Sequence, residues 1–152
     1  KAEWQKKLRL DITSPITGHV ASLYMQDKQV KYLLVPQKKF YVGAASENIL
    51  KPVLMVPLNP SWLYNIFFDR PIEGKDWSCT QDAQGRVEQC KNLPQKITIT
   101  WKDRAGERKT VLLDHSLGSL QMNFVTFASK VSDPDKAFQL EAPKNFEKLK
   151  VQ

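Results

Sequence analysis

The stretch Ile97–Asp114 reads ITITWKDRAGERKTVLLD, and it decides the fold class. Apolar residues recur at every second position on both sides of a polar centre, which is the period of a half-buried β-strand. A turn centred on Ala105 places Ile99 opposite Val111, so the apolar side chains of both strands share one face. The stretch therefore predicts an antiparallel hairpin.

The same period of two recurs along most of the chain. Gln37-Lys38 is read as a tight turn that sets Leu33 opposite Val42. In total the pattern predicts about nine to eleven strands in consecutive hairpins, an antiparallel meander, with a basic tail after the last strand. The clearest strand segments outside the opening stretch are residues 4–12, 19–26, 30–36, 40–44, 120–128 and 138–140.

Two short helical segments interrupt the strands. Ser46 is suited to cap a helix through Ile49 and Leu50, which Pro52 must end. Asn59-Pro60 is a cap followed by a first-turn proline, and it predicts a second helix that Asp69-Arg70-Pro71 stops. Both helices are too short to be stable alone, so we expect them to pack on a sheet.

The two cysteines, Cys79 and Cys90, flank a polar segment with Gln84-Gly85 at its midpoint. If Gln84-Gly85 is a two-residue hairpin turn, the cysteines fall directly opposite each other, about 4.5–5.5 Å apart at Cα, which suits a disulfide. Two unrelated buried thiols are the alternative. A disulfide would indicate an oxidising compartment. No zinc-type spacing is present, so no metal and no cofactor are expected.

Composition indicates one globular domain, residues 1–152, with 41% hydrophobic residues and a formal net charge of +7. The lysines are scattered among strands and turns, and no zinc knuckle or RNA-binding motif appears, so we expect no nucleic-acid partner. Anionic lipid or an acidic partner fits the charge better. No apolar run reaches the roughly 20 residues of a membrane-spanning helix. The start at Lys1 is interpreted as that of a mature or trimmed fragment, with any lipid anchor upstream.

Residue types used in catalysis occur without the arrangement that catalysis needs. Asp114-His115-Ser116 contains the residue types of a triad, but strand neighbours point to opposite faces. His19 is interpreted as a surface histidine, and no phosphate-binding loop is present. We therefore expect that the protein is not an enzyme. The apolar segment 49–72 is the unusual feature, and it can fill a core or line a ligand cavity.

Three segments in order carry a resemblance to a known family. Residues 10–18, followed by the alternating Val20–Met25, resemble the LolB family of outer-membrane lipoprotein receptors, in which proline, a large aliphatic residue and glycine form a protruding turn. Residues 55–71, MVPLNPSWLYNIFFDRP, are similar to its helical insert, and residues 92–114 to its late strands. The chain departs from the family in the extra Thr17 before Gly18, in the cysteine hairpin, and in an ending closer to LolA-like relatives.

The resemblance implies a mainly β fold, a curved antiparallel half-barrel with the two helices as a lid over an apolar cavity. It implies a periplasm-facing lipoprotein, lipid-anchored at the outer membrane, that accepts lipoproteins from a periplasmic carrier protein. Such a protein binds acyl chains and helps to insert lipoproteins at the outer membrane, acting as a chaperone in protein transport. Ile16 takes the protruding position that contacts the membrane, although an isoleucine at a turn can also fold back onto its sheet.

We predict that apolar side chains from the strands and the second helix line the cavity. The protein is expected to be a monomer whose partners are lipid acyl chains or lipoproteins, the carrier and the outer-membrane surface. The alternative is a structural or regulatory envelope lipoprotein that grips a protein partner without lipid transfer; a small enzyme is a third possibility. The predicted ligand-binding residues are Leu10, Ile12, Leu33, Phe40, Leu54, Leu63, Phe67 and Ile99.

Overall fold

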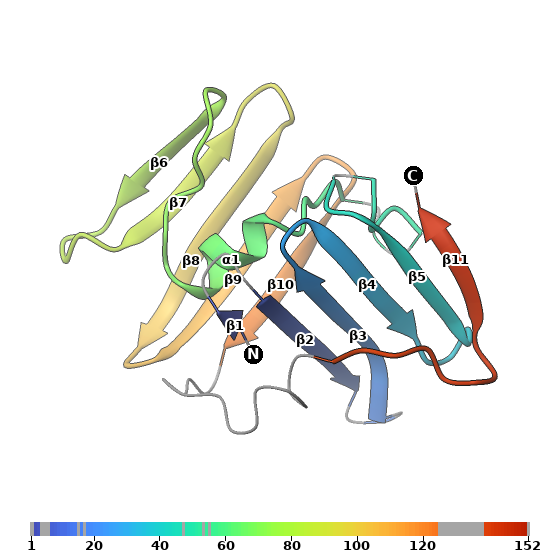
Figure 1. Ribbon diagram of the computed structural model, residues 1–152. Coiled ribbons are helices and arrows are strands. Elements are labelled where there is room, and N and C mark those ends of the chain that lie inside the picture. Colours follow the sequence, from blue (N-terminus) through green and yellow to red (C-terminus); the bar gives the residue numbers. More distant parts are fainter. Residues whose placement is uncertain are drawn as a thin grey trace. The chain divides into compact units, whose positions relative to one another are not determined.

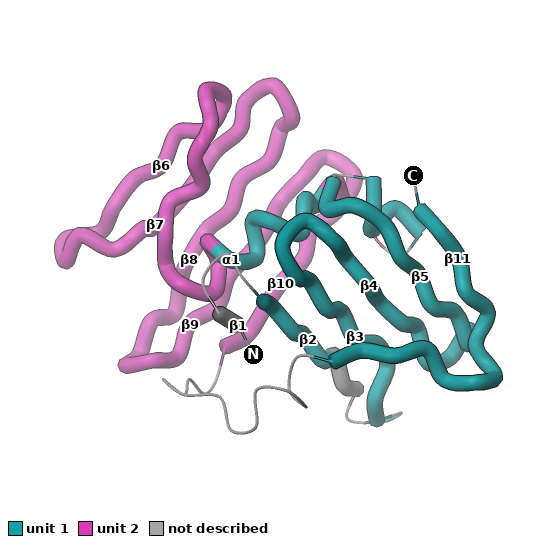
Figure 2. Tube along the Cα trace, in the orientation of Figure 1, with its two compact units in different colours: residues 1–52, 58–64, 130–152 teal, residues 53–57, 65–129 magenta. Residues whose placement is uncertain are grey.

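The computed structural model describes residues 2–3, 7–14, 16, 18–46, 48–52, 54, 56–124 and 139–151, without the side chains of residues 2–3 and 12–14. In these residues the protein is mainly β, with eleven strands and one helix. The chain divides into two compact units (Figure 2). The first contains residues 1–52, 58–64 and 130–152, and the second contains residues 53–57 and 65–129.

The first unit contains a six-stranded sheet in the order β1-β2-β3-β4-β5-β11 (Figure 1). Neighbouring strands are antiparallel except β11, which runs parallel to β5. The last strand lies in the segment predicted as a basic tail, whereas Gln139 and Leu140 are not in a strand and Phe138 is outside the described residues. The strands are β1 (Ala2–Glu3), β2 (Lys7–Ser14), β3 (Gly18–Gln26), β4 (Gln29–Leu34), β5 (Lys39–Ala44) and β11 (Glu147–Val151).

The turn that follows β5 packs against one face of this sheet. Tyr32 and Tyr41 stack with their ring centroids 4.7 Å apart, and the Tyr32 hydroxyl donates a hydrogen bond to the Ile49 carbonyl at 2.9 Å. Gly43 makes this approach possible, because a Cβ there would collide with the Ile49 side chain and with the Val151 carbonyl oxygen. The lack of a side chain at Gly43 thus lets two segments pack closely against β5.

The helix predicted through Ile49 and Leu50 is absent from the described residues, and the prediction is wrong. This segment consists of turns, with Ile49 N–H donating to the Ser46 carbonyl at 3.3 Å and Lys51 N–H to the Asn48 carbonyl at 3.1 Å. Ser46 Oγ accepts from Asn48 N–H at 3.3 Å, as a capping residue would. Pro52 cannot donate an amide hydrogen bond, so too few residues follow the cap to nucleate a helix.

The second unit contains a five-stranded antiparallel meander, in the order β10-β9-β8-β7-β6. Its buried face includes Ile97, Ile99, Trp101, Val111 and Leu113, all in phase along β8 and β9, as the opening stretch predicted. The hydrogen-bonded strands therefore form two sheets rather than one continuous meander. The strands are β6 (Trp77–Gln81), β7 (Val87–Asn92), β8 (Ile97–Ala105), β9 (Arg108–His115) and β10 (Gly118–Phe124).

The strand registers differ from those predicted by two residues. Ile99 pairs with Leu113 rather than Val111, because the strands have a bulge between Lys102 and Ala105 and turn at Gly106-Glu107. Similarly, Leu33 pairs with Phe40 rather than Val42. Side chains alternate with a period of two, so a shift of two residues leaves the predicted faces unchanged.

The second predicted helix is confirmed as α1 (Trp62–Phe67). Asn59 caps it as expected: its Oδ1 accepts from Ser61 N–H at 3.0 Å, and its carbonyl accepts from Trp62 N–H at 3.0 Å. The helix stops where Asp69 adopts a positive φ of 53°, and Arg70 N–H donates to the Asn65 carbonyl at 2.9 Å. The cap and stop signals therefore decide its short length.

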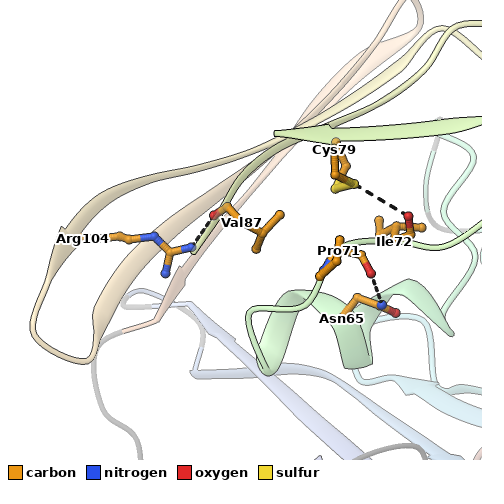
Figure 3. Close-up of a disulfide and its surroundings, with 7 residues drawn as sticks. Asn65, Pro71, Ile72, Cys79, Val87 and Arg104 are labelled. Atoms are coloured by element: carbon orange, nitrogen blue, oxygen red, sulfur yellow. Dashed lines mark hydrogen bonds between the residues drawn. A yellow bond between two sulfur atoms is a disulfide. The ribbon is translucent and has the colours of Figure 1, made fainter. Parts of the chain in front are cut away.

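The Cys79–Cys90 disulfide is confirmed, and it joins directly paired residues of β6 and β7 with a Cα–Cα distance of 4.1 Å. Figure 3 shows Cys79 facing the Ile72 carbonyl oxygen, 3.7 Å from its Sγ. The turn is longer than the two residues predicted. Asp82 organises it, because its Oδ1 accepts from the amides of Gln84 and Arg86, both at 2.9 Å.

Removal of the disulfide by Cys79→Ser with Cys90→Ser is expected to lower the free energy of unfolding by about 2–3 kcal/mol, since the bond closes a short loop of the unfolded chain. Urea unfolding of the parent and variant measures this loss. Thiol labelling of the denatured, unreduced parent provides the direct control, and two reactive thiols per chain would contradict the pairing.

Candidate functional site

The hairpin between β2 and β3 presents Ile16 to solvent. Its side chain is 93% exposed, so it does not fold back onto the sheet. Gly18, which begins β3, has a φ of +76°, a conformation that glycine adopts without strain. Pro15 and Thr17 lie outside the described residues. Membrane contact by Ile16 stays a prediction. Such a contact requires an exposed side chain, and the Ile16 side chain is exposed.

A hydrogen-bonded polar cluster joins β2 and β3 near this turn. Ser22, which is buried, donates from Oγ to Asp11 Oδ1 at 2.5 Å, and Asp11 also pairs with Arg9 Nε at 3.0 Å. His19 Nε2 lies 2.7 Å from Ser22 Oγ and 3.0 Å from the Ala21 carbonyl oxygen. Asp11 and Ser22 are direct cross-strand partners, so the register of the hairpin assembles the cluster.

This cluster contains Ser, His and Asp, but its order is not that of a nucleophile activated by a base. The Ser22 hydroxyl donates to Asp11 rather than to His19, and the Ala21 carbonyl beside His19 Nε2 can only accept a hydrogen bond. Partial burial acts to raise the pKa of Asp11, yet the hydrogen bond from Ser22 and the ion pair with Arg9 outweigh it and lower that pKa. The cluster therefore fixes the hairpin base with an ionised carboxylate.

The predicted ligand-binding residues of the first unit do not share one face of its sheet. Leu10 pairs with Leu23, which pairs with Tyr32, and these side chains lie on one face. Leu33 and Phe40 pair with each other one position along, so they point to the opposite face. The expectation of a single space lined by Leu10, Leu33 and Phe40 is wrong. It did not take into account that successive side chains of a strand point to opposite faces of the sheet.

The remaining predicted residues are placed as follows. The Ile12 side chain lies outside the described residues, and Leu63 of α1 is almost fully buried. In the second unit, Ile99 is fully buried on β8, and Leu54 is half-buried. Phe67, also half-buried, packs edge-to-face on Phe124 with a centroid distance of 5.0 Å. Ligand contact by any of them stays a prediction.

A buried lysine that the sequence reasoning overlooked holds the end of α1 in the second unit. Lys109 is 7% exposed, and its Nζ donates to the carbonyls of Ile66 at 2.7 Å and Phe67 at 3.0 Å. A third bond goes to Asp69 Oδ1 at 2.8 Å, and the Phe124 ring lies 4.9 Å from Nζ. A cation is favourable at a helix C-terminus, where the last carbonyls lack partners.

The charge of Lys109 is partly compensated by its surroundings. Burial lowers the pKa of Lys109, the hydrogen bond and charge of Asp69 oppose that change, and Arg104 adds to it. Arg104 contacts the same Asp69 oxygen at 3.2 Å and donates to the Val87 carbonyl at 2.6 Å, a bond drawn in Figure 3. Asp69 thus joins α1 to β8 and β9. The sequence did indicate that Lys109 is buried, since Lys109 alternates in step with the apolar Val111 and Leu113.

In the described part of the chain, no helix is both long and apolar enough to cross a membrane. Within those same residues, no cluster of three or more His, Cys, Asp and Glu residues is placed to hold a metal ion. Comparison with protein-family models gives no match, and neither does comparison with curated protein sequences.

Proposed function

We propose that this protein is a periplasm-facing lipoprotein of the outer membrane that binds acyl chains and helps to receive or insert lipoproteins there. In this proposal a periplasmic carrier delivers the cargo, and the protein acts as a monomer without a catalytic step. The fold that this proposal implies is a LolA/LolB-like half-barrel, with α1 as part of its lid. The apolar cavity lies beneath that lid.

The exposure of Ile16 is the observation that carries the proposal. A branched aliphatic side chain that is 93% exposed contributes almost nothing to the core. Contacts among Arg9, Asp11 and Ser22 join β2 and β3 at the base of its hairpin. Transfer of this side chain into lipid is worth about 1.5–3 kcal/mol, enough to orient a tethered protein but not to anchor it.

Two further features support the proposal. The Cys79–Cys90 disulfide is typical of a protein that folds in an oxidising compartment such as the periplasm. The short apolar helix α1 is bound to its neighbouring strands at one end by Lys109, as expected of a lid segment that belongs to a sheet.

Ile16→Glu is expected to slow cargo transfer into liposomes about tenfold or more, because a charged side chain loses the lipid contact. Folding and acyl-chain binding should stay as in the parent, since the side chain lies outside the core. A transfer assay with fluorescent acylated peptide and acceptor liposomes measures the rate. Ile16→Leu is the matched control and should keep the parent rate.

Equal rates for Ile16→Glu and the parent would make Ile16 a bystander. The alternative function, a protein partner gripped without lipid transfer, would then explain the chain better.

A further inference from the structure

Two turns at one end of the five-stranded sheet carry large exposed apolar side chains. Leu93, in the β7–β8 turn, is 80% exposed, and Leu117, in the β9–β10 turn, is 60% exposed. Alternate turns of a meander lie at the same end of its sheet, as Figure 1 shows for these two. Two strand spacings separate the turns, so their backbones lie about 10 Å apart.

Hydrogen bonds that do not involve the leucine side chains determine the conformation of both turns. Asn92 Oδ1 accepts from Gln95 N–H at 3.0 Å, while Lys96 N–H donates to the Leu93 carbonyl at 3.1 Å. His115 Nδ1 accepts from Leu117 N–H at 3.1 Å. Such turns favour glycine, asparagine and aspartate, and neither leucine side chain is needed for the backbone path. The leucines are therefore presented on ordered turns without a structural reason for their size.

The opposite end of the same sheet has a different composition. Its β6–β7 turn, residues 82–86, reads DAQGR, and its β8–β9 turn is Gly106-Glu107. Neither contains a large apolar residue. The exposed leucines are thus confined to one end of the sheet.

Formal charge at the leucine end is balanced, although the whole chain carries +7. The strand pairs Trp77–Asn92 and Thr98–Asp114 place β6, β7, β8 and β9 termini together there. The exposed charged residues at these termini and turns number three of each sign: Glu73, Asp76 and Asp114 against Lys75, Lys91 and Lys96.

We propose that this end of the second unit contacts a lipid bilayer, with Leu93 and Leu117 entering its interfacial region. Two separate protruding side chains need no matching pocket in a bilayer, whereas a protein surface would have to supply one for each. The balanced charge allows approach to zwitterionic headgroups and predicts apolar rather than electrostatic binding. This contact is additional to Ile16 and does not depend on acyl-chain transfer.

Flotation of the purified chain with phosphatidylcholine vesicles tests the proposal. Leu93→Ser with Leu117→Ser should lower the partition coefficient about tenfold or more. Raising salt from about 0.05 to about 0.5 M should change parent binding less than about twofold, because screening affects only charge. Ala83→Ser, in the turn at the opposite end, is the matched control and should bind as the parent does.

Absence of parent binding to the vesicles, or equal partition of the double variant, would overturn the proposal. Concentration-dependent self-association of the parent that the double variant loses would assign the leucines to a protein contact instead, and would overturn it as well. Acyl-chain binding is measured in parallel on the same proteins. Its presence or absence reports on the proposed function separately from this surface.

Discussion

Lys109→Met is expected to lower the free energy of unfolding by about 2–4 kcal/mol. The variant leaves the Ile66 and Phe67 carbonyls without their charged donor and removes one partner of Asp69. We expect a smaller loss of stability than for a fully buried ion pair, because Asp69 is partly exposed and remains paired with Arg104. Urea denaturation followed by circular dichroism gives the difference.

The matched control is Lys102→Met, an exposed lysine of β8 in the same sheet, which should stay within about 0.5 kcal/mol of the parent. A loss below about 1 kcal/mol for Lys109→Met would show that water replaces the ammonium at the helix end, and that the three hydrogen bonds add little net stability.

Phe67→Glu is expected to weaken the binding of a fluorescent fatty acid about tenfold or more. The side chain belongs to the proposed ligand-binding set and is only half-buried, so a carboxylate there can be accommodated. Leu63 is less suitable for this test because it is almost fully buried, and Leu63→Glu would unfold the protein. Fluorescence titration measures the dissociation constant.

Phe68→Glu supplies the control, since Phe68 is also half-buried and directly follows Phe67, the last residue of α1. It should bind the fatty acid as the parent does. Saturable binding that Phe67→Glu leaves unchanged would place the lipid elsewhere.

The faces of the sheets and the disulfide were predictable from the sequence, but the exact pairing was not. The alternation around Ile99 and Leu113 fixes which side chains are buried, whereas the bulge at Lys102 and Ala105 moves the turn. A bulge leaves no mark in a period-two pattern. The disulfide was easier to predict, since Cys79 and Cys90 are the two cysteines of the chain. A short hairpin sets them opposite each other.

Elements that depend on distant partners were missed. Strand β11 alternates Leu149 and Val151 with lysines, but its parallel partner β5 lies about a hundred residues earlier in the chain. Likewise, the sequence places the charged Lys109 among alternating positions that are buried. Only the fold shows that its ammonium group bonds to the end of α1. The division of the strands into two sheets depends on the same long-range pairing.

Native mass spectrometry of the protein purified from cells without denaturant tests the central claim, acyl-chain binding, most directly. We predict a population whose mass exceeds that of the chain by one acyl-bearing lipid, and loss of that excess on denaturation, which separates bound lipid from a covalent anchor. A single mass that denaturation leaves unchanged, in protein that also fails to take up added fatty acid, would contradict the account.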